Sequence, residues 1–289
     1  MTRDVSLTGT LLEVHDLAVG YETSTGLFGR PKVVPVVQGV TFDIAPGETL
    51  GFVGESGSGK STVGKAILRL VPPLGGSIRF DGRDVAGDGP RAPLSYRRQV
   101  QAVFQDPSAS LNPQHLVSHA LDEAMRRHGV SDRRERRTRT LEALDMVNLG
   151  QGHLHRFPAE LSGGQQQRVA IARALVLRPR LVVCDEAVSA LDLATQGQII
   201  NLLADLQKAT GLSYLFIAHD LGLVRHIAHR VGVMQAGTLV ELADTESIFE
   251  SPGHEYTQQL LAATPASHPE GRENRRKRRL AARAEKSAT

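Results

Sequence analysis

The sequence has little that would place it in an oxidising compartment or inside a membrane. It contains one cysteine, Cys184, in 289 residues, and no apolar run approaches the roughly 20 residues that cross a bilayer. A lone cysteine forms no internal disulfide and no cysteine-ligated zinc or iron–sulfur site, so we expect Cys184 to be a small buried side chain. The first residues also lack the basic segment and apolar core of a secretory signal. These absences exclude a membrane-spanning subunit and favour the cytosol.

The chain also has little excess of charge of either sign, except near the C-terminus. The chain has 34 lysines and arginines against 31 acidic residues, a net charge of +3. Residues 270–289 hold eight of the basic and three of the acidic side chains, so the remainder is nearly neutral. Hydrophobic residues make up 40% of the chain, which excludes a mainly disordered protein. We expect residues 270–289 to form a solvated, disordered tail, with attraction to an anionic membrane surface as the alternative.

Strand and helix patterns alternate along most of the chain. Residues 11–53 are typical of short strands separated by turns, and apolar residues spaced three and four apart from Val63 to Leu70 predict a helix. Between residues 106 and 160 charged helical stretches replace the strands, which predicts an inserted helical lobe. Strands and helices alternate again after residue 161. This order predicts an α/β fold with a mostly parallel sheet covered on both faces.

A glycine-rich loop at residues 54–61 is the first segment that carries chemistry. It matches the pattern G-x-x-x-x-G-K-[ST], with an apolar strand before it and a helix after it. Glycines let successive backbone N–H groups point at phosphate oxygens, and the helix N-terminus adds partial positive charge. The residues of this phosphate loop are Gly54, Glu55, Ser56, Gly57, Ser58, Gly59, Lys60 and Ser61.

A second segment, residues 181–186, is an apolar run that ends in two carboxylates, Asp185 and Glu186. In an open α/β sheet, ligands bind at the carboxyl ends of the strands, which is where these two side chains are expected. Strand alternation predicts that they point to opposite sides, so that one faces a metal ion and the other an attacking water. The pattern alone also fits many ordinary strand ends, and it indicates a catalytic site only in combination with the phosphate loop.

A third segment, residues 161–165, reads Leu-Ser-Gly-Gly-Gln and precedes a helix with an apolar stripe. Ser162 is a plausible N-cap, and the two glycines would let a phosphate approach the backbone. On its own this signature segment is equally compatible with an ordinary capped helix.

Phosphate loop, signature segment and strand-borne carboxylates in this order resemble the ATP-binding-cassette (ABC) ATPases. Four further residues fit the family's pattern: Gln105 at a strand end, Asp192 after residues 189–191, His219 after an apolar strand, and Tyr21 where the family has an aromatic that stacks on adenine. The resemblance covers about residues 12–265. It implies a P-loop cassette with a mostly parallel sheet, an N-terminal antiparallel β subdomain and an inserted helical lobe.

The resemblance also implies a role for each matching position, with ATP and Mg²⁺ as cofactors. Glu186 would be the general base, Gln105 would contact the metal and the water, and His219 would contact the γ-phosphate. Mg²⁺ would be bound by Ser61, Asp185 and Gln105. The signature segment would act on ATP bound to a facing subunit. The remaining nucleotide-binding positions are Tyr21, the phosphate loop with Thr62, the signature residues Ser162, Gly163, Gly164 and Gln165, and Asp192.

Residues 105–113, 184–192 and 248–261 resemble the ATPase subunits of di- and oligopeptide importers, and the long segment Gly20–Val37 resembles the second ATPase of such systems, the type called F. Ala187 and Glu255 replace prolines that are usual at these positions, and neither change removes a catalytic group. Many members of that subfamily carry an iron–sulfur cluster after the extension, and we predict none here because no cysteine follows Cys184. The implied division is an ATP-binding core at 1–105 and 161–240, a helical lobe at 106–160, an importer-type extension at 241–269 and the tail at 270–289.

The resemblance therefore predicts the ATP-hydrolysing subunit of an ABC importer, peripheral on the cytoplasmic face of the cell membrane. Its partners would be two transmembrane permease subunits, a second ABC ATPase subunit, with a heterodimer favoured over a homodimer, and indirectly an extracytoplasmic solute-binding protein. Dipeptides or oligopeptides are the expected solutes, with nickel as the alternative. No specific nucleic acid is expected. The alternative function is a soluble, non-transport ABC ATPase that acts on nucleic acid or ribosomes through its basic tail.

Overall fold

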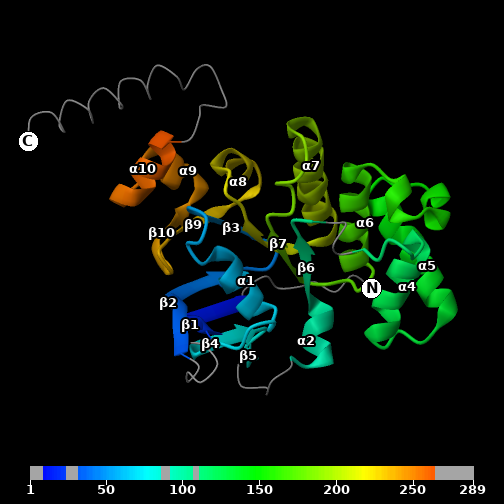
Figure 1. The fold of residues 1–289 in the computed structure, drawn as a ribbon, viewed down its shortest axis with the longest axis horizontal. Helices are drawn as coiled ribbons and strands as arrows, with labels where there is room; N and C mark the ends of the chain where they lie inside the picture. The colour runs from blue at the N-terminus through cyan, green and yellow to red at the C-terminus, as the bar shows by residue number, and fades with distance from the viewer. Residues whose placement is uncertain (1–8, 24–31, 86–91, 107–110, 264–289) are drawn as a thin grey trace, which may run out of the picture.

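The computed structural model describes residues 9–23, 32–85, 92–106 and 111–263 as two sheets with helices around them (Figure 1). The tail at 270–289 and part of the segment at 105–113 lie outside these residues. A larger sheet has the strand order β10-β9-β3-β8-β7-β6, and a smaller antiparallel sheet has the order β2-β1-β4-β5. The fold class expected from the sequence is confirmed.

The strands are β1 Leu12–Thr23, β2 Lys32–Ile44, β3 Thr49–Val53, β4 Gly75–Phe80, β5 Arg83–Asp84, β6 Val100–Phe104, β7 Leu181–Asp185, β8 Ser213–Ile217, β9 Arg230–Gln235 and β10 Thr238–Asp244. The helices are α1 Lys60–Ile67, α2 Leu94–Gln99, α4 Val117–Arg127, α5 Arg133–Met146, α6 Gly163–Leu175, α7 Leu193–Thr210, α8 Leu221–Ile227, α9 Thr245–Glu250 and α10 Glu255–Ala263, with short 3-10 turns at Gln151–His155 and Pro158–Glu160. In the described residues no helix is both long and apolar enough to cross a bilayer.

The central strands of the larger sheet, β3, β8 and β7, are buried on both faces, as their continuous apolar runs predict. Strands β9, β3, β8, β7 and β6 run parallel, and β10 adds an antiparallel edge. Alternate residues of β7 pack into different cores: Leu181 and Val183 face a core shared with α1 and the small sheet, whereas Val182 and Cys184 face a core shared with α6, α7 and α8. The sheet is therefore the middle layer of the molecule.

Cys184 is fully buried, as expected. Burial, with a smaller effect of the neighbouring Asp185 carboxylate, raises the pKa of the thiol to about 12. The thiolate is the reactive form of cysteine, and at neutral pH almost none of it is present at such a pKa. The side chain therefore contributes packing to the core.

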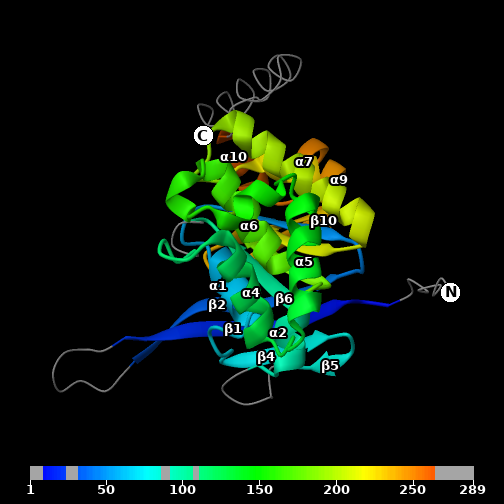
Figure 2. The ribbon, with the colours of Figure 1, turned by 90° about the vertical axis from the view of Figure 1, so that its right-hand side faces the viewer.

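The N-terminal strands are longer than the sequence suggested. β1 has 12 residues and β2 has 13, and their pairing runs from Leu12 opposite Ile44 to Thr23 opposite Lys32. Only the second half of β2 alternates between buried and exposed residues, so its first half gave no strand pattern. Figure 2 shows these strands as a long ribbon that extends beyond the rest of the small sheet.

The helix after the phosphate loop is shorter than the apolar spacing predicted. α1 ends at Ile67, and Arg69 adopts a left-handed backbone conformation with φ 57°. Leu70, which the spacing placed on the buried face, is 61% exposed. The expectation for Leu70 was wrong because the turn at Arg69 takes the chain away from the helix axis.

Between β6 and β7 the described chain is mostly helical, and α4 and α5 lie in the lobe that the sequence predicted at 106–160. Asp132 caps α5 by accepting hydrogen bonds from the N–H groups of Arg134 and Glu135. Two arginines of α5 are largely covered by neighbouring residues, since the side chains of Arg136 and Arg139 are each only 11% exposed. Figure 1 shows these helices on one side of the sheet, with α9 and α10 on the other.

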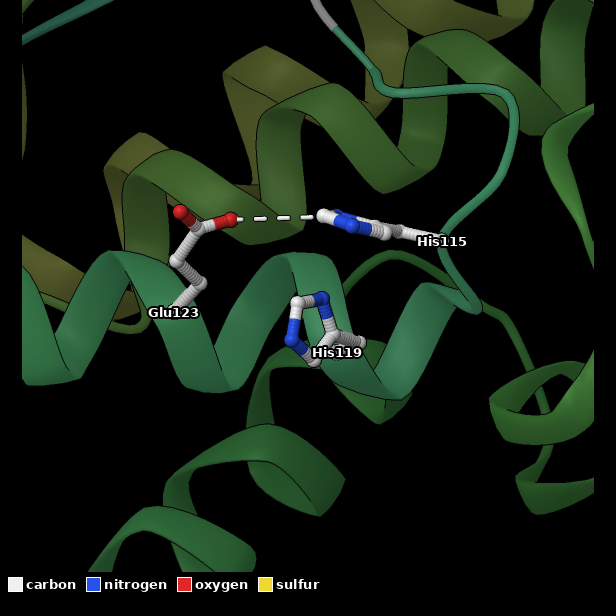
Figure 3. Close-up of side chains that lie close together, drawn as sticks. All are labelled: His115, His119 and Glu123. Carbon is white, nitrogen blue, oxygen red and sulfur yellow. Dashed lines mark ion pairs between the residues drawn. The ribbon is translucent and has the colours of Figure 1, made fainter.

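Three polar side chains converge on α4 and the turn before it (Figure 3). His115 Nδ1 lies 3.9 Å from a carboxylate oxygen of Glu123, and the rings of His115 and His119 meet edge to face. The other oxygen of Glu123 accepts from Arg127, and Arg173 also lies within electrostatic reach of this carboxylate. The positive charges of the two guanidinium groups beside the Glu123 carboxylate disfavour binding of a divalent cation there. We therefore interpret His115, His119 and Glu123 as a surface cluster of the helical segment.

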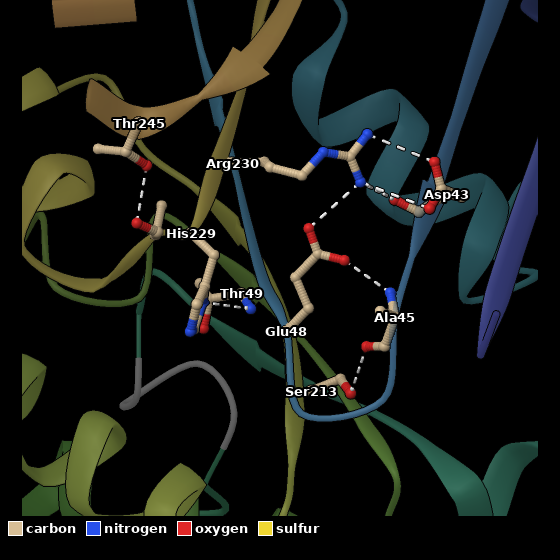
Figure 4. Close-up of polar contacts among 9 residues, drawn as sticks. Asp43, Ala45, Glu48, Thr49, Ser213, His229, Arg230 and Thr245 are labelled. Atoms are coloured by element: carbon tan, nitrogen blue, oxygen red, sulfur yellow. Dashed lines mark hydrogen bonds and ion pairs between the residues drawn. The ribbon is translucent and has the colours of Figure 1, made fainter. Parts of the chain in front are cut away.

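A polar network joins the two sheets at the turn between β2 and β3 (Figure 4). Glu48 is 9% exposed, accepts from the N–H of Ala45 at 2.6 Å, and lies 3.2 Å from a guanidinium nitrogen of Arg230. The same guanidinium lies 3.4 Å from Asp43 at the end of β2. The Ser213 hydroxyl of β8 donates to the carbonyl of Ala45 at 3.2 Å. The network fixes where the small sheet meets β3, the strand that leads into the phosphate loop.

Replacing Arg230 with methionine should lower the free energy of unfolding by about 1–3 kcal/mol, because the nearly buried Glu48 carboxylate loses its cationic partner. Chemical denaturation of the variant and the wild type measures the difference. Arg178→Met is the control, because Arg178 pairs with Glu142 at the surface, with both side chains largely exposed, and should cost less than about 1 kcal/mol. Equal effects of the two substitutions would contradict the importance given to this network.

Candidate nucleotide-binding site

The residues predicted to bind nucleotide lie where parallel strands of the larger sheet end. β3 ends at Val53 before the phosphate loop, β6 at Phe104 before Gln105, and β7 at Asp185 before Glu186. β8 ends at Ile217, two residues before His219. Because neighbouring parallel strands point the same way, these ends meet at one edge of the sheet, here called the carboxyl edge.

The conformation of the phosphate loop depends on glycine at Gly54. Its φ is 145°, and a Cβ there would lie 2.1 Å from the carbonyl oxygen of Met234 in β9. Any side chain would therefore force the loop away from the sheet. Gly59, with φ 100°, directly precedes α1. Residues 56, 57 and 59–62 line a hollow together with Val36 and Glu186, so the loop forms one wall of a concave site.

Lys60 lies inside this loop and is only 4% exposed. Its ammonium group donates to the carbonyl oxygens of Gly54 and Glu55, both at 2.8 Å, and to the Ser58 hydroxyl at 3.2 Å. Burial lowers the pKa of Lys60, and the nearby carboxylates, Glu186 first, oppose that shift. A buried cation with only loop oxygens and distant carboxylates around it suits an anionic ligand such as a phosphate.

Ser61 of the phosphate loop and Asp185 of β7 lie 124 positions apart in the sequence, yet their side chains are in contact. The Ser61 hydroxyl donates to Oδ1 of Asp185 at 2.7 Å. Oxygen ligands of one octahedral Mg²⁺ at about 2.1 Å lie roughly 3 Å apart, so this pair fits two adjacent positions of such an ion. The residues present therefore suit the magnesium site that the sequence predicted.

Glu186 follows the strand rather than belonging to it, so strand alternation does not set its direction. It adopts φ 51°, an uncommon conformation for a residue other than glycine. Its N–H donates to the Ile217 carbonyl at 2.9 Å, and its carbonyl accepts from the N–H and the hydroxyl of Ser189, both at 3.0 Å. This strained conformation is held from both sides, and it places Glu186 in the wall of the hollow beside the phosphate loop.

Gln105 and His219 are both exposed at the carboxyl edge. Gln105 is the first residue after β6, on the far side of β7 from the phosphate loop. His219 is followed by Asp220, which begins α8 by accepting from the N–H groups of Gly222 and Leu223. The structure thus places both residues at the edge expected for them, with side chains open to a ligand or a partner.

Tyr21 lies on β1, beside the helix that follows the phosphate loop. Its hydroxyl is 3.4 Å from the Thr62 hydroxyl, and the residue is 37% exposed. The ring therefore stands at the side of the hollow with part of its surface open. An exposed aromatic face in this position suits stacking of a base whose phosphates occupy the loop.

The signature segment is not among the residues that line the hollow of the same chain. Ser162 caps α6 as expected, accepting from the N–H of Gln165, while the Gln165 side chain accepts from the N–H of Ser162 at 3.1 Å. A Cβ on Gly164 would lie 2.6 Å from Thr195, whose hydroxyl donates to Asp192. Glycine at this position therefore serves the packing of α6 on α7, in addition to any approach of a phosphate.

Sequence reasoning missed contacts that distant parts of the chain make with the loop. The N–H of Gly237 donates to the Ser58 carbonyl at 3.0 Å, and Val36 lines the hollow. The Tyr256 hydroxyl, on α10, accepts a hydrogen bond from the N–H of Glu55 at 3.1 Å. The two residues are 201 positions apart, and no local pattern links them.

Comparison with known proteins adds the following. The family model of the ABC transporter matches residues 37–189, and that of the oligopeptide/dipeptide transporter C-terminal region matches residues 240–288. Glutathione import ATP-binding protein GsiA of Salmonella typhimurium is 46% identical over 269 residues, which is 92% of this chain and 43% of the relative. GsiA of Escherichia coli K12 is 46% identical over 260 residues, 90% of this chain and 42% of the relative. The chain thus spans less than half the length of these relatives.

Solved structures show the same fold. The protein cbiO1 from Clostridium perfringens, described as part of the ABC transporter complex cbiONQ, has a TM-score of 0.72 at 26% identity, covering 84% of this chain and 91% of that one. The ATP-binding cassette MJ0796, in a dimeric post-hydrolysis state with ADP and Pi, has a TM-score of 0.68 at 28% identity, covering 81% and 98%. The ABC transporter model matches more than half of the chain, so the chain belongs to the ABC transporter family, and its residues 240–288 are similar to the C-terminal region of oligopeptide/dipeptide transporters.

Proposed function

We propose that this chain is the ATP-hydrolysing subunit of an ABC importer for peptides. The observation that carries the proposal is the 2.7 Å contact between Ser61 and Asp185 beside the buried Lys60, which puts a magnesium-type oxygen pair next to a phosphate-type cation. The match of residues 240–288 to a peptide transporter model supports the solute class. The relatives named for glutathione import support it too, because glutathione is a short peptide. Nickel is the alternative solute.

Each residue of the carboxyl edge has a defined task in this proposal. The backbone N–H groups of the phosphate loop and the Lys60 ammonium bind the phosphates, and Tyr21 stacks on adenine. Mg²⁺, when bound to Ser61 and Asp185, would neutralise charge on the β- and γ-phosphates. Glu186 accepts a proton from the attacking water. Gln105 orients that water, and His219 donates to the γ-phosphate.

The signature segment completes the site of a facing subunit. Ser162 and the N-terminus of α6 are exposed, outside the hollow of their own chain, and form a capped helix end suited to an anion. A hollow open to solvent leaves the γ-phosphate in contact with bulk water, and a second cassette would exclude that water and add donors. The dimeric state of MJ0796 supports this arrangement. We therefore propose a head-to-tail dimer with a second ATPase subunit, in which ATP closes the interface and hydrolysis reopens it.

The helical segment between β6 and β7 transmits this motion in the proposal. It lies to one side of the sheet, begins at Gln105 on the carboxyl edge and ends in the signature segment, which begins α6. Two permease subunits would contact it from the membrane, which places the chain on the cytoplasmic face as a peripheral subunit, with a solute-binding protein across the membrane. The match to a transporter model favours this function over a soluble ATPase that acts on nucleic acid.

The proposal is tested by purifying the tagged full-length chain from gently solubilised native membranes and identifying what accompanies it. Two multi-span permeases and a second cassette are the expected companions, and the associated binding protein would identify the solute. Recovery of the chain with ribosomes or nucleic acid, or mainly from the soluble fraction, would contradict the importer.

Lys60→Ala should weaken ATP binding by about 100-fold, because the charge-assisted contact to the phosphates is lost. A titration with a fluorescent ATP analogue measures the affinity. Lys65→Ala, on the same helix but outside the lining of the hollow, should bind as the wild type does. Unchanged affinity in Lys60→Ala would show that the phosphates bind elsewhere.

Glu186→Gln should lower ATP turnover by about 10²- to 10⁴-fold, because the amide cannot accept the proton of the attacking water. ATP binding should persist, and the ATP-bound dimer should accumulate in size-exclusion chromatography. Glu142→Gln, at an exposed pair on α5, is the control and should leave turnover unchanged. Turnover within a few-fold of wild type in Glu186→Gln would refute its role as general base.

A further inference from the structure

Tyr256, a side chain of the C-terminal extension, contacts the phosphate loop. The backbone N–H of Glu55, the second residue of the loop, donates to the Tyr256 hydroxyl at 3.1 Å. Tyr256 is only 7% exposed and belongs to the core cluster that includes Val53, the last residue before the loop. Its ring is therefore fixed by packing, and its hydroxyl has a defined position beside the loop.

A set of hydrogen bonds holds the turn that precedes Tyr256. The Glu241 carboxylate of β10 accepts from the N–H of Gly253 at 2.7 Å and from the N–H of His254 at 3.2 Å. His254 Nδ1 in turn accepts from the N–H of Tyr256 at 3.1 Å. Glu255, where the subfamily usually has proline, begins α10 with an acidic side chain in the first turn, which the helix dipole favours. The turn is thus ordered despite this departure.

The extension as a whole is anchored to the body of the molecule. Ile248 of α9 is fully buried, and Phe249, Leu260 and Leu261 pack against the same core cluster as Tyr256. Figure 1 shows α9 and α10 next to β9 and β10. A hydroxyl presented from packed helices holds its partner more firmly than one presented from a mobile segment.

The start of the phosphate loop is consequently held from two sides. From inside, the Lys60 ammonium bonds the carbonyl oxygens of Gly54 and Glu55. From outside, Tyr256 bonds the N–H of Glu55. When phosphates bind, Lys60 must turn toward them, and its bonds to the loop carbonyls weaken. The bond from Tyr256 does not depend on Lys60, so it persists through that exchange.

We propose that Tyr256 is a positioning residue that keeps the phosphate loop in its ATP-receptive conformation, and that it couples the C-terminal extension to nucleotide binding. The proposal rests on ATP binding at this loop, as proposed above. Tyr256 acts through the backbone of Glu55 and does not itself touch the nucleotide. Preorganisation of this kind increases affinity because less conformational freedom is lost on binding. Coupling is reciprocal, so ATP must in turn stabilise α10.

Tyr256→Phe tests this in the full-length protein, because it keeps the ring and removes only the acceptor. Isothermal titration with ATP should show about 3- to 10-fold weaker binding, with KM raised and kcat within about two-fold of wild type. Tyr214→Phe is the matched control: its hydroxyl is also buried, but it donates to the Leu203 carbonyl in α7, away from the loop. That variant should bind ATP as the wild type does.

Hydrogen exchange provides a readout that simple loss of packing would not produce. ATP should slow amide exchange over residues 253–263 in the wild type and in Tyr214→Phe, and this effect should be lost in Tyr256→Phe. Glu241→Gln, which weakens the support of the turn without changing Tyr256, should shift ATP affinity in the same direction by a smaller factor.

If Tyr256→Phe binds ATP with wild-type affinity, and ATP still slows amide exchange over residues 253–263 in this variant, the coupling is overturned while the ATP site stays intact. Equal weakening in Tyr214→Phe would show that any lost tyrosine hydroxyl has this effect, which also overturns it. Failure of the wild-type chain to bind ATP would instead refute the proposed site, and with it this inference.

Discussion

The parallel pairing of β3, β8, β7 and β6 is the constraint on which the rest of the structure depends. Because these strands run in one direction, the segments that follow them emerge at a single edge of the sheet. Residues that are distant in sequence, such as Ser61 and Asp185, thereby come within hydrogen-bond distance. The two cores that cover the sheet hold this edge rigid, so that loops can be strained or exposed without loss of the fold.

Rigid and adaptable groups are distributed along the edge in a way that suits a cycle of binding and hydrolysis. The phosphate loop and Glu186 are fixed by backbone bonds and by conformations that the neighbouring strands impose. Gln105, His219 and Ser162 are exposed to solvent. In the proposed function the first group binds and positions ATP, whereas the second group responds to a γ-phosphate and a facing subunit. Tyr256 adds a contact from the extension to the rigid group.

Local patterns predicted the parts of the site that depend on local rules. The phosphate loop and the cap at Ser162 could be recognised because glycine conformations and capping bonds involve residues that are close in sequence. Leu70 was placed wrongly because apolar spacing does not reveal where a helix stops. The direction of Glu186 depends on a positive φ stabilised by β8 and could not be read from alternation. The contact of Tyr256 with the loop joins residues 201 positions apart, which no local pattern encodes.

The position of ATP tests the central claim, that the carboxyl edge is the nucleotide site, most directly. A photoreactive azido-adenine analogue of ATP, added with Mg²⁺ to the purified complex, would mark the residues next to the base, and mass spectrometry would identify the labelled peptide. We expect labelling of the β1 peptide that contains Tyr21, beside Thr62 at the start of α1, and protection by excess ATP. Labelling elsewhere in the chain, with none at β1 that ATP suppresses, would contradict the account.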